Sequence, residues 1–303
     1  MQEKKEREHT GTMTKTLRAL IPEPIKGPLK AAIFTYRSMT SGLRVMPDFL
    51  VIGAARSGTT SLYRYLVRNP SIAAASTKEI QYFSIHHWRG IKWYKAHFPT
   101  LMTAKIMTWR FGVTGQTGEA TPYYLFHPLA AERIAETLPN VKLMIVLRNP
   151  IERAFSHYLH EVALGVENLS FEEAIDEEPR RLEGEVERIA SDPKYPGFKY
   201  QHFSYLSRGI YHDQLVRWFS LLPRERFLIL ESERFWKDPQ AGYVAVLRFL
   251  GLPPIPLSEY PQHNKSESSR MSSGTKDRLL EFFAPHNERL YGILGEDLGW
   301  ELL

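Results

Sequence analysis

An apolar run that leads through a glycine-containing turn into a helix constrains the fold of this chain most. Residues 49–52 (FLVI) are apolar and end at Gly53, which indicates a buried strand. Apolar side chains then recur at helical spacing over residues 61–69, and Pro70 ends the pattern. This segment therefore predicts a strand, a tight turn and a helix in succession.

The same alternation recurs twice. Residues 141–147 (VKLMIVL) and 227–230 (FLIL) are apolar runs, and a helical pattern follows each of them, one opening at Pro150 and the other ending at Gly251. Strands that alternate with helices form parallel sheets with helices on both faces. We therefore expect an α/β protein with a single P-loop-like domain, in which helices flank a central parallel sheet.

The stretch between the second and third apolar runs is predicted to be a helical insertion. Residues 171–188 and 211–221 have helical patterns, and we expect them over the C-terminal edge of the sheet, where such folds bind ligands. Residues 258–274 are polar and unpatterned, which is typical of a lid. Within them, Lys265 and Arg270 are candidate contacts to a bound phosphate, with a solvated loop as the alternative interpretation.

The net charge of +5 is confined to the first 45 residues. Residues 1–45 hold nine Lys or Arg and four Glu, whereas residues 46–303 hold 30 basic and 30 acidic residues. The body therefore lacks the general basic field of a nucleic-acid-binding protein. We interpret residues 1–45 as a basic, poorly ordered arm. Its mixture of basic and apolar residues also suits peripheral contact with an anionic membrane.

The chain has no cysteine, which excludes disulfides and any zinc site with Cys ligands. No apolar stretch approaches the length of a spanning helix, and the N-terminus lacks the apolar region of a secretory signal. We therefore expect a cytoplasmic protein. The sequence leaves the oligomeric state open.

The turn after the first strand is suited to phosphate. Residues 53–61 (GAARSGTTS) offer the backbone N–H groups of a helix N-terminus together with several hydroxyls. In nucleoside triphosphatases a Lys follows the second glycine, but here that residue is Thr59, and the basic residue is Arg56. The second strand likewise ends at Arg148 instead of a metal-binding Asp. This pattern predicts an anion that is bound without a metal.

With these motifs in view, the chain resembles the sulfotransferases that use 3′-phosphoadenosine 5′-phosphosulfate (PAPS). GAARSGTT at 53–60 resembles the 5′-phosphosulfate loop of that family, and LRNPIERAFSHY at 147–158 resembles its 3′-phosphate motif. KEIQYF at 78–83 is similar to the glycosaminoglycan branch, in which the matching Glu is the catalytic base. A weaker likeness, GEATPY at 118–123, extends the resemblance to roughly residues 48–300.

The resemblance implies a role for each matched residue. Glu79 would be the general base and Arg56 would contact the reacting sulfonate. The cofactor-binding residues would be Arg56, Ser57, Gly58, Thr59, Thr60, Ser61, Arg148 and Ser156, with PAPS as donor, PAP as product and no metal. Lys265 and Arg270, which lie in the polar segment and in no matched motif, are further candidates for contact with the phosphates. Aromatic residues such as Tyr82, Tyr94, Tyr123 and Tyr124 are candidates for stacking on a sugar ring, and core packing is the other interpretation.

Two positions depart from the glycosaminoglycan branch. Arg56 replaces its usual Lys but remains cationic and can bind two oxygens at once. Ala120 replaces a Lys that helps to hold an acidic sugar chain. The predicted reaction is transfer of a sulfuryl group to a hydroxyl of a carbohydrate or glycoconjugate. The alternatives are a small alcohol, phenol or amine as acceptor, a nucleotide kinase, and a non-catalytic module that binds polyanions.

Overall fold

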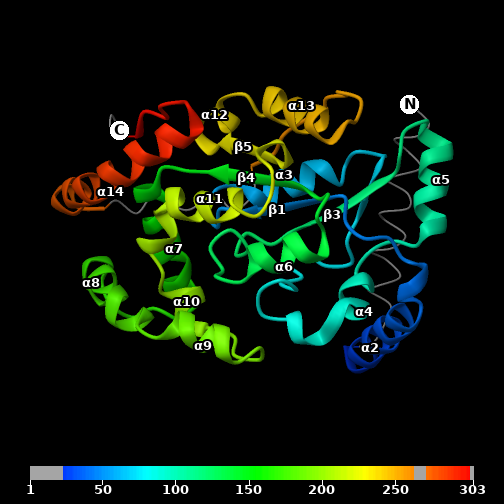
Figure 1. Cartoon of the computed structure of the whole chain (residues 1–303), viewed down its shortest axis with the longest axis horizontal. Helices are drawn as coiled ribbons and strands as arrows, with labels where there is room; N and C mark the ends of the chain where they lie inside the picture. Colours follow the sequence, from blue (N-terminus) through cyan, green and yellow to red (C-terminus); the bar gives the residue numbers. More distant parts are fainter. Residues whose placement is uncertain (1–22, 263–270, 301–303) are drawn as a thin grey trace.

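The computed structural model describes residues 23–262 and 271–300. Its centre is a five-stranded sheet, entirely parallel, with the strand order β2-β3-β1-β4-β5. The strands are β1 (Phe49–Gly53), β2 (Ile72–Ala74), β3 (Gln116–Ala120), β4 (Lys142–Leu147) and β5 (Phe227–Glu231). The predicted α/β class and parallel sheet are therefore confirmed (Figure 1).

The helices occupy most of the remaining described chain. They are α2 (Glu23–Met39), α3 (Thr59–Leu66), α4 (Gly90–Lys95), α5 (Leu101–Phe111), α6 (Ala130–Thr137), α7 (Pro150–Ala163), α8 (Phe171–Leu182), α9 (Glu185–Ser191), α10 (Phe198–His202), α11 (Tyr211–Phe219), α12 (Ser232–Lys237), α13 (Pro239–Leu250) and α14 (Ser273–Leu294). Four short 3₁₀ turns are η1 (Ser41–Leu43), η2 (His87–Arg89), η3 (Ser207–Gly209) and η4 (Arg224–Arg226).

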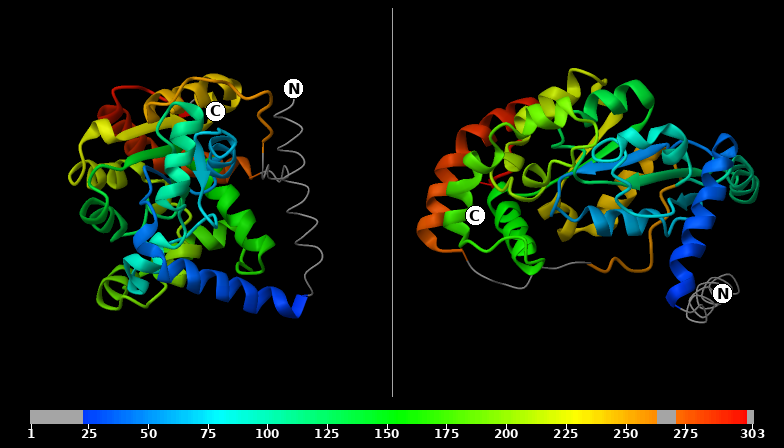
Figure 2. Two further views of the ribbon diagram at one scale, coloured as in Figure 1. Left: turned by 90° about the vertical axis from the view of Figure 1, so that its right-hand side faces the viewer. Right: turned by 90° about the horizontal axis from the view of Figure 1, so that it is seen from below.

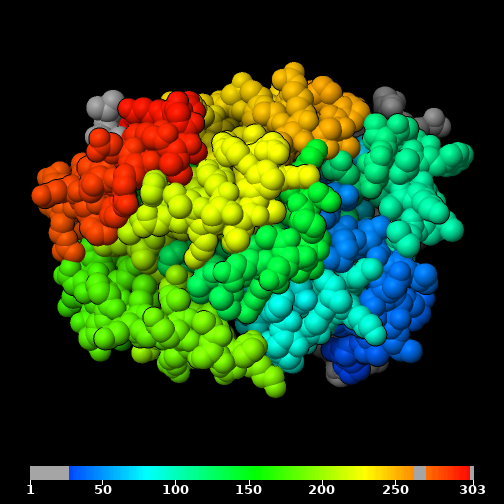
Figure 3. Space-filling model, viewed as in Figure 1, coloured from blue at the N-terminus to red at the C-terminus, as the bar shows by residue number. Residues whose placement is uncertain are grey.

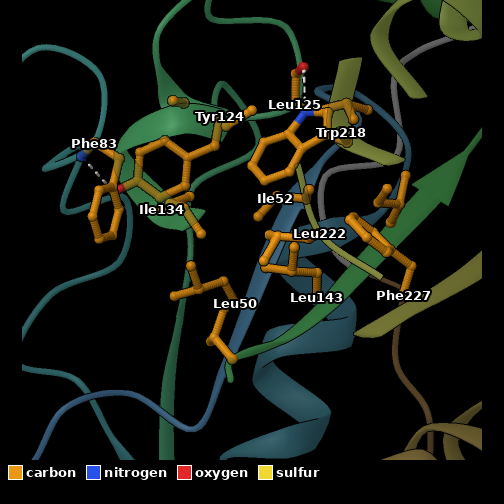
Figure 4. Close-up of a cluster of buried hydrophobic side chains, with 14 of the residues drawn as sticks. Leu50, Ile52, Phe83, Tyr124, Leu125, Ile134, Leu143, Trp218, Leu222 and Phe227 are labelled. Carbon is orange, nitrogen blue, oxygen red and sulfur yellow. Dashed lines mark hydrogen bonds between the residues drawn. The ribbon is translucent and has the colours of Figure 1, made fainter. Parts of the chain in front are cut away.

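Alternate side chains of the strands build a core on each face of the sheet. Leu50 and Ile52 of β1 pack with residues from α6, α11 and the end of α14. Figure 4 shows Tyr124 and Trp218 of α11 on one side of Ile52 in this cluster. Phe49 and Val51 point to the opposite face and pack with α3, α12 and α13. A strand that is buried on both faces is continuously apolar. This is why β1 and β4 were recognisable in the sequence.

Local signals fix the helices that flank the sheet. Asn149 caps α7 by accepting hydrogen bonds from the backbone N–H groups of Ile151 (2.9 Å) and Glu152 (3.4 Å), and Pro150 occupies the first turn. Ser170 and Glu173 form a capping box at the start of α8. The insertion α8–α11 follows β4, and Gln201, His202 and Arg208 within it line the cavity described below, as expected for an insertion over the C-terminal edge.

Part of the predicted N-terminal arm contacts the body of the protein. Helix α2 lies beside α4, and the Arg37 side chain donates hydrogen bonds to the backbone oxygens of Ala96 (2.6 Å) and Phe98 (3.1 Å) (Figure 2). Arg44 also donates to the oxygen of Phe98, at 2.8 Å. Two arginines of the predicted arm thus bind to carbonyl groups of the body, and the order of the arm as a whole stays a prediction. Residues 1–22 lie outside the described chain.

Candidate active site

A cavity of about 860 Å³ opens at the carboxyl ends of the strands. Each strand is followed by residues that line it: Arg56 after β1, Lys78 and Glu79 after β2, Thr121 after β3, Arg148 after β4 and Ser232 after β5. Because β1 lies between β3 and β4, the chain leaves β1 toward one side of the sheet and later crosses to the other. Parallel sheets bind ligands at such a switch point.

The turn between β1 and α3 forms one wall of the cavity. Arg56 has φ 69° and Gly58 has φ 93°, so the backbone is left-handed at both residues. A Cβ atom at Gly58 would lie 3.1 Å from the Trp236 ring, which leaves little room for any other residue. The turn directs the N-terminus of α3 toward the cavity. The buried Ser57 hydroxyl has no hydrogen-bond partner within the described chain, as expected of a group that awaits a ligand.

Two guanidinium groups and a hydroxyl meet beside this turn. Arg56 Nε donates to Ser156 Oγ at 3.2 Å, and Arg148 Nη1 donates to the backbone oxygen of Arg56 at 3.2 Å. Burial, followed by the positive charge of Arg148, lowers the pKa of Arg56. Two cations that repel each other in a partly buried position would be stabilised by an anion between them. We call Arg56 and Arg148 the arginine pair, and Ser156 is the serine that hydrogen-bonds to it.

Residues 79–81, in the loop after β2, form the other wall, and backbone hydrogen bonds hold this segment in place. Glu79 and Gln81 have φ 56° and 57°, although neither is glycine. Three consecutive N–H groups of this segment bind to the end of β3: Glu79 to the Ala120 oxygen (3.1 Å), Ile80 to the Glu119 carboxylate, and Gln81 to Thr121 Oγ1 (3.4 Å). These bonds offset the cost of the left-handed backbone, about 1–3 kcal/mol per residue.

Glu119 is the buried anchor of that segment. Its carboxylate also accepts hydrogen bonds from Tyr94 (2.8 Å), Tyr124 (3.1 Å) and Thr121 (2.7 Å). Burial raises its pKa to about 6 despite these donors. Glu79 itself is exposed to the cavity, so its carboxylate is available to a ligand while its backbone is fixed.

Lys78 connects the two walls. Its Nζ lies 2.5 Å from Thr60 Oγ1 in α3 and 2.8 Å from Glu79 Oε1. The sequence did not single out Lys78, although it stands next to Glu79 in the same motif. Its position places a cation between the phosphate-type turn and the candidate base.

Helix α7 contributes a second polar cluster. Glu161 lies 3.2 Å from His157 Nε2 and 2.8 Å from His202 Nδ1 of α10. Burial alone would raise the pKa of Glu161, but the hydrogen bonds from the two histidines outweigh it and lower the pKa to about 2. Burial lowers the pKa of His157 to about 3. The cluster fastens the insertion to the helix that carries Ser156.

Arg208 of the insertion is a further cation at this cavity. It is buried between the rings of Tyr123 and Phe126, each 5.1 Å from the guanidinium carbon, and Nη2 donates to the Gln201 oxygen at 2.7 Å. Among the described residues, no carboxylate forms an ion pair with it. No motif singled out Arg208, because its position at the cavity depends on how the insertion folds back.

The structure brings most of the predicted site residues together. Arg56, Ser57, Gly58, Thr59, Thr60, Glu79, Arg148 and Ser156 line the one cavity. Ser61 does not line it and is fully buried under the turn. Of the candidate stacking aromatics, Tyr123 lines the cavity, whereas Tyr82, Tyr94 and Tyr124 belong to the core. Lys265 and Arg270 lie outside the described residues.

Over residues 23–262 and 271–300, no group of three or more His, Asp or Glu side chains is placed to hold a metal ion. No helix in the same part of the chain has both the length and the apolar character needed to span a bilayer.

Comparison with known proteins agrees with this geometry. Residues 46–279 match the family model of the sulfotransferase domain. A membrane-associated sulfotransferase, kil1, of Dictyostelium discoideum is 27% identical over 92% of this chain and 72% of its own length. Heparan sulfate glucosamine 3-O-sulfotransferase 6 of Mus musculus is 24% identical over 93% of this chain and 84% of its own length.

A solved structure supports the same assignment. The sulfotransferase from Alicyclobacillus acidocaldarius is 29% identical, with a TM-score of 0.62, and the match covers 86% of this chain and 100% of that one. It shares the central parallel sheet with flanking helices. Since the family model covers most of the chain, including both walls of the cavity, the protein belongs to the sulfotransferase family of enzymes.

Proposed function

We propose that the protein transfers the sulfuryl group of PAPS to a hydroxyl group of a carbohydrate or glycoconjugate, with Glu79 as the general base. One observation carries the proposal: Arg56, Arg148 and Ser156 line the same cavity as the Glu79 carboxylate, and Lys78 contacts both Glu79 and Thr60 of the β1–α3 connection. An anion-binding wall thus faces a wall that carries a base.

The residues present fit a nucleotide with phosphate at both ends. The β1–α3 turn offers helix N-terminal N–H groups and the unpartnered Ser57 hydroxyl to a 5′-phosphosulfate. Arg148, between β4 and the N-cap of α7, and Ser156, in the second turn of α7, are suited to a 3′-phosphate. When bound, PAPS supplies the sulfuryl group and a phosphate leaving group.

The chain's own groups divide the remaining work. Glu79 accepts the proton of the attacking hydroxyl, and the left-handed turn at residues 79–81 aims its carboxylate into the cavity. Arg56 stabilises the negative charge that develops on the leaving oxygen, because its guanidinium is partly buried and fixed by Ser156. Lys78 adds a positive charge between them.

The lining of the cavity beyond Glu79 supports a polar acceptor. Gln81, Gln201 and His202 present amide and imidazole groups there, and the buried Arg208 adds a positive charge. A carbohydrate can use these donors and acceptors, whereas a small phenol would need an apolar pocket. Relatives named for heparan sulfate, at 24–26% identity, also support a carbohydrate. A small alcohol or an amine is the alternative acceptor.

Binding of nucleotides tests the donor half of the proposal. Calorimetry on the unmodified protein should show PAP binding about 10- to 100-fold more tightly than adenosine 5′-monophosphate, because one charged contact contributes about 1.5–3 kcal/mol. Arg148→Ala should remove most of this difference. Equal affinities for the two nucleotides in the unmodified protein would remove the assignment of Arg148 and Ser156.

Turnover tests the base. Glu79→Gln should keep PAP affinity and lower kcat about 10²- to 10⁴-fold, since it removes the proton acceptor and keeps the shape. Glu152→Gln is the matched control: Glu152 also lines the cavity, but it lies 3.7 Å from Arg148, on the nucleotide side. If both variants lose activity equally, Glu79 is not the base. Labelled PAPS with polysaccharides, phenols, alcohols and amines then identifies the acceptor.

A further inference from the structure

Helix α5 exposes a row of large apolar side chains. None of its eleven residues is buried, and Met102, Ile106 and Trp109 are 65%, 53% and 87% exposed. These residues are four and then three positions apart, so they share one face of the helix. Single exposed apolar residues are ordinary, but a contiguous row marks an interaction surface.

Helix α2 exposes a second row at the same end of the molecule. Leu29, Ile33 and Tyr36 follow the same spacing and are 39%, 51% and 65% exposed. A hydrogen bond joins the segment that follows α2 to the segment that precedes α5: the Val45 N–H donates to the Pro99 oxygen at 3.1 Å. Figure 1 places both helices at its right-hand end, and in Figure 3 blue and cyan-green parts of the chain lie at the surface there. Seen from that end, both helices are in view (Figure 2).

Apart from Glu23 at the start of α2, the charged residues of α2 and α5 are all basic. Residues 24–47 and 100–118 contain no Asp or Glu. Lys30 of α2 and Lys105 and Arg110 of α5 are exposed beside the apolar rows. This end therefore combines exposed apolar side chains with exposed basic ones.

The exposed apolar rows and the basic residues beside them indicate which kind of partner this surface would bind. A second copy of the chain would bring lysines and arginines against each other, which disfavours a self-complementary contact. The surface of a bilayer with anionic lipids offers negative headgroups to the basic residues and an acyl boundary to Met102, Ile106 and Trp109. We propose that the exposed faces of α2 and α5 form a peripheral docking surface for an anionic membrane.

The proposed surface is separate from the cavity. No residue of α2 or α5 lines the cavity, so the proposal does not depend on the donor, the base or the acceptor. Substitutions on α5 should accordingly leave turnover of a soluble acceptor unchanged. A loss of membrane binding and a loss of catalysis can therefore be told apart.

Vesicle binding by the full chain tests the proposal. The protein should co-sediment with vesicles of phosphatidylcholine containing phosphatidylglycerol at 0.1 M salt, and binding should fall at least tenfold with pure phosphatidylcholine. The triple variant Met102→Ser, Ile106→Ser and Trp109→Ser should bind the anionic vesicles at least tenfold more weakly. The control, Val216→Ser, Ile255→Ser and Phe282→Ser, removes exposed apolar residues elsewhere and should bind as the unmodified protein does.

Two results of the vesicle experiment would contradict the proposal. If the unmodified protein ignores anionic vesicles, or if the α5 variant binds them as well as the control variant does, the proposal is overturned. The second result would assign any binding to residues outside this surface. If light scattering shows a dimer that the α5 variant abolishes, the surface joins two copies of the chain instead. PAP affinity, measured for every variant, verifies that each remains folded.

Discussion

The two walls of the cavity are built by different means. The nucleotide wall uses two direct strand-to-helix turns, after β1 and after β4, so helix N-termini and two arginines are delivered by the topology of the sheet. The wall that carries Glu79 is a loop in a left-handed conformation, held to β3 by hydrogen bonds. Anion binding thus follows from the fold itself, whereas positioning of the base depends on a buried carboxylate, Glu119, in the neighbouring strand.

Removing the charge of Arg56 should have the largest effect on the nucleotide wall. Arg56→Gln keeps a hydrogen-bond donor but removes the positive charge, and kcat should fall about 10²- to 10³-fold. Arg148→Gln should instead act mainly on PAP affinity, because Arg148 is assigned to the 3′-phosphate and not to the group that is transferred. Steady-state kinetics with PAPS and calorimetry with PAP measure both effects.

This pair of variants can break the comparison. If both substitutions lower kcat and PAP affinity in the same proportion, the nucleotide wall acts as one electrostatic unit and Arg56 has no special contact with the reacting group. Arg56→Lys refines the result, since Lys keeps the charge and loses the forked geometry. Its kcat should lie between those of the unmodified protein and Arg56→Gln.

Glu119 should make the facing wall sensitive to pH. Its pKa is raised from 4.5 to about 6 in the folded protein, so the folded state binds more protons than the unfolded state between these values. The stability that protonated Glu119 contributes is fully present below pH 4.5 and is lost as pH rises through 6. The free energy of unfolding should fall by about 2 kcal/mol from this group.

A difference curve isolates that contribution. His97 and His157, with pKa values lowered by burial to about 4 and about 3, increase stability over part of the same range as pH rises. Denaturant unfolding of the unmodified protein and of Glu119→Gln, at steps from pH 4 to 7, cancels those groups. The stability of the unmodified protein relative to the variant should decline with pH. A constant difference would show that Glu119 does not titrate in this range.

The comparison also shows what could be predicted from sequence. β1, β4 and β5 were predicted because their runs are apolar, and the turn residues at 53–60 follow from the helix N-terminus. β3 (QTGEA) was not predicted, although it neighbours β1. Gly118 is required there because a Cβ atom would lie 2.4 Å from the Phe49 oxygen, and Glu119 is polar because it holds the loop. Because residues such as these are required locally, β3 lacks the run of apolar residues by which a buried strand is recognised in a sequence.

Contacts between segments that are distant in the sequence could not be predicted, for another reason. Lys78 reaches Thr60, and Arg208 reaches Tyr123, only after the sheet has formed and the insertion has folded over its edge. No spacing along the chain encodes such contacts. By contrast, Arg148 and Ser156 lie eight residues apart on one strand–helix connection, so one local motif carries both.

The smallest predicted effect concerns Lys276, in the first turn of α14. It lines the cavity and is half-buried, and no motif contains it. A flexible ammonium group that is partly screened by water contributes about 0.2–1 kcal/mol to the binding of an anion, so Lys276→Gln should raise the Kd for PAP about two- to fivefold. The change should shrink at 0.5 M salt, and Lys276→Arg should bind as the unmodified protein does. A loss as large as that of Arg148→Gln would mean that α14 supplies a third anchor to the nucleotide wall. That wall would then no longer be explained by two strand-to-helix turns alone.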